Sequence, residues 1–160
     1  MKSKLLSVFV IFLSILSMSV FDAFAESEGF RGIKWGDSFR SVTDMNYERT
    51  NNANGAIYYT RGSEELIHHG AVIKKIEYGF INDKFTDVSI EATGTVNCKA
   101  LKDSSLEEFG IPTEELNGKL FKWVAGKTVR VYLEKPDGRS CVLKMGSITP
   151  SQDNSSAKQQ

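Results

Sequence analysis

Ser38 and the two histidines are the residues of this sequence whose types could support nucleophilic catalysis. Ser38 follows Gly36 and Asp37, and the chain's histidines are the adjacent pair His68 and His69. A serine hydroxyl becomes a nucleophile when a neighbouring histidine takes its proton. A small serine hydrolase that uses Ser38 is therefore one alternative for this chain.

The block from Gly36 to Phe39 resembles the opening of the GDSL-type hydrolases, in which the serine is the nucleophile. Those enzymes supply the histidine in an Asp-x-x-His block near the C-terminus, and neither His68 nor His69 lies in such a block. An Asp-Ser pair before apolar residues is also typical of a helix N-cap. We predict that Ser38 is such a cap and that the chain has no catalytic residue and is not an enzyme.

His68 and His69 could instead hold a metal ion together with Glu64 or Glu65. Adjacent residues on a strand point to opposite faces, so two such rings rarely reach one ion. We predict a polar loop here, with no metal site and no cofactor. The pairs Glu107-Glu108 and Glu114-Glu115 could do acid–base work if burial separated their pKa values, but runs of this kind are usually solvated.

Aromatic side chains give a different hypothesis, because several of them fall on predicted strands. Alternation along a strand places Tyr58 opposite Tyr59, and Tyr132 opposite Val131, so some rings must face outward. Rings on a rigid, open sheet face make a plausible binding surface. The candidate binding residues are Tyr58, Tyr59, Trp123 and Tyr132.

The first 25 residues have the order of a secretory signal. Lys2 and Lys4 precede an apolar run from Leu5 to Phe21, and Ala23-Phe24-Ala25 is a small-x-small cleavage pattern. A retained membrane anchor is the alternative, but the run is shorter than the roughly 20 apolar residues that a span needs. We predict cleavage after Ala25, a periplasmic or secreted location and no membrane span in the mature protein.

The charge of the mature chain is close to neutral. The whole chain has 20 basic and 20 acidic residues, and loss of Lys2, Lys4 and Asp22 leaves 18 and 19. No basic excess is available for a phosphate backbone, so nucleic acid is not expected as a partner. We expect one domain over residues 26–146 and a disordered polar tail over 147–160.

Cys98 and Cys141 are the two cysteines, and both follow the predicted signal. Two cysteines in an oxidising compartment most often pair, so we predict a Cys98–Cys141 disulfide. Two buried free thiols are the alternative.

Hydrophobic periodicity predicts two helices, opened at Ser38 and at Asn97, the second ending at Gly110. A hairpin is expected around the turn Asn82-Asp83, with a bulge at Phe85. The predicted strands are 56–61, 75–81 and 88–92 after the first helix and 120–124, 129–133 and 141–145 after the second. The predicted class is α+β, as two helix-plus-three-strand antiparallel meander units in a two-layer domain.

Two short motifs in this pattern resemble a known group of small exported proteins. One is Gly36-Asp37-Ser38 with Val42, and the other is the block from Phe109 to Pro112. With the meanders, they are similar to the αβββ modules of the β-lactamase-inhibitor-protein-like and SmpA/OmlA-type envelope family. The chain lacks the lipidation cysteine of the lipoprotein members. The resemblance implies protein binding or envelope assembly rather than catalysis, and it transfers no single site residue.

The sequence therefore favours an exported, non-enzymatic domain that binds another envelope or secreted protein through an open sheet face. A periplasmic binder of a small apolar ligand or a glycan, which would use the same aromatic residues, is the second alternative.

Overall fold

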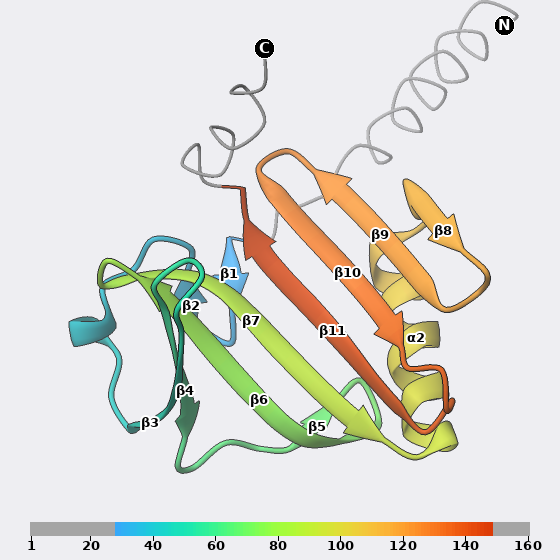
Figure 1. The fold of residues 1–160 in the computed structure, drawn as a ribbon, viewed down its shortest axis with the longest axis horizontal. Helices are drawn as coiled ribbons and strands as arrows, with labels where there is room; N and C mark the ends of the chain where they lie inside the picture. Colours follow the sequence, from blue (N-terminus) through green and yellow to red (C-terminus); the bar gives the residue numbers. More distant parts are fainter. Residues whose placement is uncertain (1–27, 149–160) are drawn as a thin grey trace, which may run out of the picture.

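The computed structural model describes residues 28–148, which form a large antiparallel sheet with a helix on one face (Figure 1). The predicted signal over 1–25 and most of the predicted tail lie outside these residues. The elements are β1 Gly29–Phe30, β2 Ile33–Lys34, η1 Phe39–Ser41, β3 Met45–Asn51, β4 Ala56–Arg61, β5 Ile67–His68, β6 Ala71–Ile81, β7 Lys84–Thr93, α2 Thr95–Phe109, β8 Glu114–Leu116, β9 Leu120–Ala125, β10 Thr128–Glu134 and β11 Ser140–Ser147.

Within the described residues the main sheet has nine strands. Its order is β3-β4-β6-β7-β11-β10-β9-β8, and β5 pairs with β6 beside this path. Every pairing is antiparallel, and β1 and β2 form a separate two-stranded ribbon. The predicted α+β class with two helix-plus-meander units is therefore wrong, because residues 28–148 form one α-helix and one continuous sheet.

The first predicted helix is wrong from Val42 onward, where the backbone is no longer helical. Ser38 does cap a helix, since its side chain accepts from the Arg40 amide at 3.2 Å, but that helix is only the short η1. Val42 is already extended, and Asp44 has a positive φ of 65°. The Asp44 carboxylate accepts from the amide and hydroxyl of Ser63 at 3.0 and 2.6 Å, and this tertiary contact holds the chain where β3 begins.

The hairpin of β6 and β7 is confirmed. Asn82 and Asp83 both have positive φ, which gives the twist that a two-residue hairpin turn needs. Phe80 pairs with Phe85 and Gly79 pairs with Asp87, so Thr86 is an extra residue and the predicted bulge is present.

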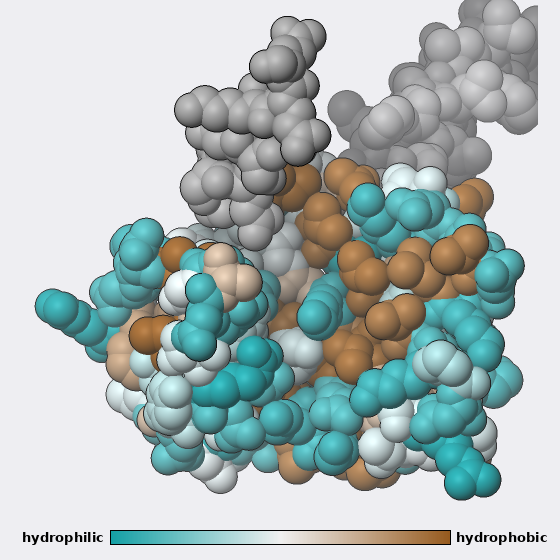
Figure 2. All heavy atoms as spheres, viewed as in Figure 1, coloured by the Kyte–Doolittle hydropathy of each residue, from teal (hydrophilic) through white to brown (hydrophobic). Residues whose placement is uncertain are grey.

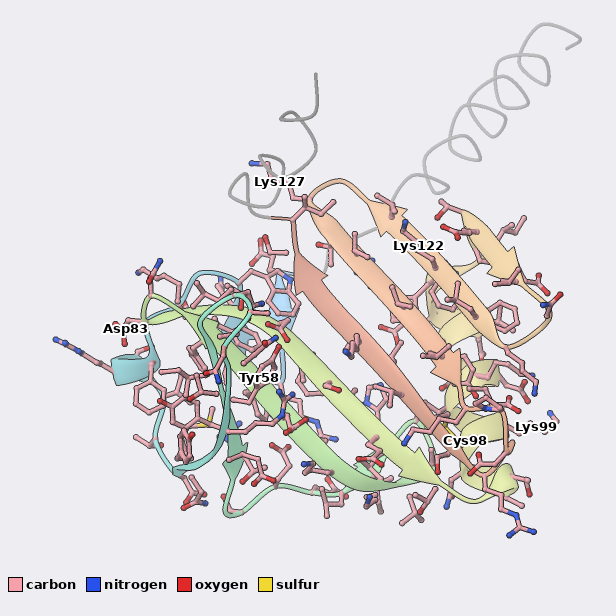
Figure 3. All side chains as sticks on the ribbon, viewed as in Figure 1. Tyr58, Asp83, Cys98, Lys99, Lys122 and Lys127 are labelled. Carbon is pink, nitrogen blue, oxygen red and sulfur yellow. A yellow bond between two sulfur atoms is a disulfide. The ribbon has the colours of Figure 1, made fainter. Side chains whose placement is uncertain are left out.

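The core lies between the sheet and α2. Leu101 and Phe109 of the helix are buried against the sheet, and the Tyr132 hydroxyl donates to the Cys98 carbonyl at 3.1 Å. The Cys98–Cys141 disulfide is confirmed and ties α2 to β11 (Figure 3). The disulfide is consistent with an oxidising compartment outside the cytoplasm.

Both ends of α2 show how glycine sets its length. The helix begins at Thr95 after the N-cap Gly94, which has a φ of 88°, so the prediction that Asn97 caps it is wrong. Asn97 instead accepts from the Val72 amide at 3.2 Å. The predicted end at Gly110 is confirmed, with a φ of 72° and an N–H bond to the Leu106 carbonyl. No helix within residues 28–148 has the length and apolar character needed to cross a membrane.

Candidate functional site: a groove on the open face of the sheet

The face of the sheet opposite α2 is divided into a mainly aliphatic half, which also carries Lys122 and Lys144, and a charged half. Figure 1 views the sheet from this side, and Figure 2 shows apolar side chains gathered over β9, β10 and β11. Val124 and Leu133 are 44% and 46% exposed there. The strand pairings place on the same face Leu120, Val129, Val131 and Val142.

The charged half lies over β6 and β7 and is internally paired. Arg49 donates to both carboxylate oxygens of Glu77, at 2.9 and 3.2 Å. Lys75 contacts Glu48 and Glu77 at 3.1 and 3.2 Å. The Arg49 guanidinium also lies 3.8 Å from the centre of the Tyr58 ring, so it covers that ring. These contacts fasten β3 over the sheet and leave the four charges satisfied by one another.

Asp87 lies where the two halves meet, on β7 between two glycines. It pairs with Gly79 on β6 and with Gly146 on β11. A Cβ at Gly79 would overlap the Asp87 carboxylate, and one at Gly146 would lie 3.2 Å from the Asp87 Cβ. The two glycines therefore give the carboxylate room to lie flat on the sheet instead of standing out into water.

The hydrogen bonds and positive charges around Asp87 do not fully offset the cost of burying its charged carboxylate. Burial raises its pKa, although hydrogen bonds from Thr86 and Tyr58 and the charges of Lys144 and Arg49 act in the opposite direction. The Thr86 hydroxyl donates to it at 2.9 Å. Burial and the nearby Asp87 together raise the pKa of Tyr58 to about 12, so Tyr58 remains a donor at neutral pH.

A cavity of about 430 Å³ opens above these residues. Its floor is polar, one wall is aliphatic, and the turn between β3 and β4 closes the far side. The lining includes Asn51, Asn54, Tyr58, Ile81, Thr86, Asp87, Val129, Val131, Lys144 and Gly146. We call this cavity and the aliphatic strip beside it the open-face groove. Its shape and chemistry suit a ligand that brings apolar groups together with a hydrogen-bond donor.

The structure separates the four predicted binding residues. Tyr58 does point to the open face, but it is covered by Arg49 and only 9% exposed (Figure 3). Tyr59 lies on the other face, with its ring stacked 4.4 Å from that of Phe39. Trp123 and Tyr132 are buried beneath α2, at 3% and 0% exposure, so the expectation that their rings reach solvent is wrong.

Burial of Tyr132 follows from its pairing. Tyr132 pairs with Leu143, which shares a face with Cys141, and the disulfide fixes that face beneath α2. Alternation correctly separated Val131 from Tyr132, but the predicted faces are reversed, because Tyr132 is in the core and Val131 lines the groove.

Sequence reasoning missed the central residues of the groove, Asp87 and its two glycines. A signal was available, because a glycine inside a strand often marks close approach of another group. Gly79 and Gly146 both lie within strands that otherwise alternate well. Their pairing with one aspartate depends on strand order, which the sequence pattern did not give.

Ser38 lies away from the groove, at the isolated bridge to Lys84. Its hydroxyl donates to Asp83 at 2.5 Å, whereas the two histidines lie at the end of β5 and in the turn that follows it. The hydroxyl therefore contributes to the local turn structure, as the N-cap interpretation requires.

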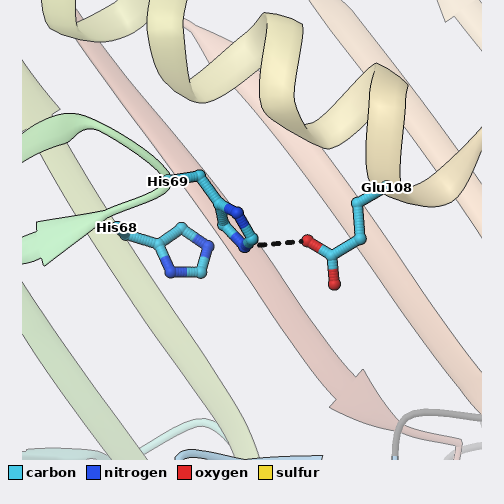
Figure 4. Close-up of side chains that lie close together, drawn as sticks. All are labelled: His68, His69 and Glu108. Carbon is cyan, nitrogen blue, oxygen red and sulfur yellow. Dashed lines mark ion pairs between the residues drawn. The ribbon is translucent and has the colours of Figure 1, made fainter.

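The histidine pair differs from its prediction in geometry. His69 has a φ of 45°, and the rings of His68 and His69 lie 4.4 Å apart, with Glu108 of α2 beside them (Figure 4). The argument from strand alternation therefore fails here, because His69 is in a turn. Burial lowers the pKa of His68 to about 4, with the charges of His69 and Arg31 acting in the same direction.

Comparisons with protein-family models, with curated proteins and with solved structures find no match for this chain.

Proposed function

We propose that this chain is an exported, non-enzymatic domain that binds a segment of another envelope or secreted protein in the open-face groove. The observation that carries the proposal is that aliphatic side chains and a partly buried carboxylate line the same cavity. The partly buried side chains of Val129 and Val131 line the same cavity as the Asp87 carboxylate, whose pKa is raised by burial. Export rests on the signal-like residues 1–25 and agrees with the disulfide.

The chemistry of the groove indicates what its ligand must present. Aliphatic side chains gain from burial against Val124, Val131 and Leu133 at about 25 cal/mol per Å² of apolar area. A donor from the ligand, such as a lysine, an arginine or a backbone amide, can reach Asp87 and offset its burial. A polypeptide segment provides both features in one molecule.

The alternative of a glycan or small apolar ligand loses its main support. Glycan binding depended on rings that stack against sugars, and Trp123 and Tyr132 are buried beneath α2. The accessible part of the groove is aliphatic and polar, which suits a peptide better.

Site-specific photocrosslinking tests the proposal. A benzoylphenylalanine at Val131 should give a discrete protein adduct when the chain is exported in cells of its source. The matched control is the same residue at Val96, which is 79% exposed on α2. We expect no adduct from position 96 and a weaker one from position 131 when Asp87 is replaced by asparagine.

Equal adducts from both positions, or an adduct from neither, would contradict protein binding in the groove. Loss of the adduct on addition of free oligosaccharide would favour the glycan alternative instead.

A further inference from the structure

Three side chains outside the groove form a cluster of nitrogen and oxygen donors. His68 is the last residue of β5, His69 lies in the turn between β5 and β6, and Glu108 comes from the last turn of α2 (Figure 4). One ligand atom from each lies within 4.8 Å of those of the others. These two histidines are the only ones in the sequence.

The backbone is folded so that both rings reach the same side. His68 pairs with Ala71, which leaves His69 and Gly70 as a two-residue hairpin turn with φ of 45° and 81°. A positive φ is uncommon for a residue with a side chain, and it turns His69 out of strand alternation. The conformation removes the geometric objection to two adjacent histidines sharing an ion.

A partly buried ion pair holds β5, the strand before this turn, in place. Arg31 pairs with Glu64 and donates to the carbonyls of Glu65 and Ile67 at 2.7 and 2.6 Å. Glu64 also accepts from the Tyr78 hydroxyl at 2.6 Å. The positive charge of Arg31 is therefore balanced by Glu64, and the carboxylate at the histidines is Glu108.

The separation of two donors already fits a small metal ion. Zinc bonds of about 2.0–2.1 Å at tetrahedral angles place neighbouring donor atoms about 3.3 Å apart. The His69 Nε2 and Glu108 Oε2 atoms are 3.1 Å apart. The ligand atoms all lie within 4.8 Å of one another, so bringing a His68 nitrogen to the same spacing needs at most about 1.5 Å of movement.

The surroundings also favour a cation. The carbonyl end of a helix carries partial negative charge, and the last turn of α2 holds Glu107 and Glu108 without a basic residue. Two positive charges oppose a cation here: Arg130 is close enough to Glu108 for the two charges to interact, and the charge of Arg31 acts on His68. The His69 and Glu108 side chains are 48% and 46% exposed, so an ion can enter from solvent.

We propose that His68, His69 and Glu108 bind one divalent transition-metal ion, such as Zn²⁺, with a water molecule in the fourth position. Two imidazoles and a carboxylate are a donor set suited to zinc, nickel or copper and not to magnesium. The ion would link the β5–β6 turn to the end of α2. The proposal is independent of the groove, which lies on the opposite face.

Calorimetric titration of ZnCl₂ into the untagged, metal-free mature protein is the test. We expect one Zn²⁺ per chain, a higher Tm with Zn²⁺ than with EDTA, and no heat with MgCl₂. His69→Gln and Glu108→Gln should each weaken the Zn²⁺ affinity at least tenfold. Glu107→Gln is the matched control, because it removes the neighbouring carboxylate on the same helix, and it should change the affinity less than twofold.

In EDTA, all three variants should have the same Tm as the wild-type protein, which would show that they still fold. If a variant has a lower Tm in EDTA, His68→Gln is tested in its place. The proposal is overturned if the wild-type protein takes up no Zn²⁺ or if it binds Mg²⁺ as tightly as Zn²⁺. It is also overturned if Glu107→Gln weakens the Zn²⁺ affinity as much as Glu108→Gln does.

Discussion

The two faces of the sheet carry different kinds of apolar side chain. The face beneath α2 holds the large rings, including Tyr78, Phe121, Trp123 and Tyr132, all fully or almost fully buried. The open face holds valines and leucines that are only partly buried. Rings bury the most area per residue, so a domain with one helical cover gains most by placing them there.

This difference changes what a binding surface on the domain should look like. The surface exposed for a partner is a row of branched aliphatic side chains that leads to Asp87, and the Tyr58 ring in the groove is covered by Arg49. A partner would then supply the anchor and the groove would supply its pocket. Substitutions on the two faces should therefore differ in how much they lower the stability of the protein.

Tyr132→Ala should destabilise the protein by about 4 kcal/mol, because it empties a fully buried site and removes the hydrogen bond from the Tyr132 hydroxyl to the Cys98 carbonyl. Urea unfolding of the variant measures the loss. Val131→Ala on the same strand is the control and should cost about 1 kcal/mol or less, since its side chain is only partly buried. Similar losses for the two variants would contradict the assignment of the faces.

Replacing Cys98 and Cys141 by serine should cost about 4 kcal/mol. The bond closes a segment with a sequence separation of 43 and holds α2 on the covered face. Hydrogen exchange should then increase first in α2, while the amides of the β6–β7 hairpin keep their protection. Increased exchange confined to the open-face edges would show that the disulfide does not fasten the cover.

Gly79→Ala should cost about 2 kcal/mol, because its methyl group would overlap the Asp87 carboxylate on the open face. In an Asp87→Ala background the same change should cost far less, which a double-mutant cycle measures. If the two substitutions lower the stability additively, the absence of a side chain at Gly79 is not what accommodates the Asp87 carboxylate.

Local patterns in the sequence predicted local structure well. The Asn82-Asp83 hairpin, the bulge after it and the three final strands follow from alternation and turn chemistry. The first helix was wrong because Asp44 is held by Ser63, a contact that no local pattern contains. The strands β3 and β8 were missed because their residues are mostly polar and depend on a neighbouring strand for pairing.

The candidate sites could be predicted only in part, for a related reason. Alternation gives the residues that share a face, as for Val131 and Leu133, but it does not say which face the helix covers. The pairing of Asp87 with Gly79 and Gly146 requires strand order, and the approach of Glu108 to His69 requires the packing of α2. Each site joins segments that are distant in sequence.

The smallest effect concerns the charge of Asp87 itself. Burial raises its pKa in the folded protein, so the folded state binds a proton more tightly than the unfolded state does. The resulting stabilisation is complete below the unfolded pKa of about 4 and is lost as pH rises through the folded pKa. The Asp87→Asn variant has no carboxylate at this position and so does not lose this stabilisation. The Tm of the variant relative to that of the wild type should therefore rise between pH 4 and pH 7. If the Tm difference falls instead, the carboxylate is stabilised by its hydrogen bonds, and a ligand would gain nothing by offering it another donor.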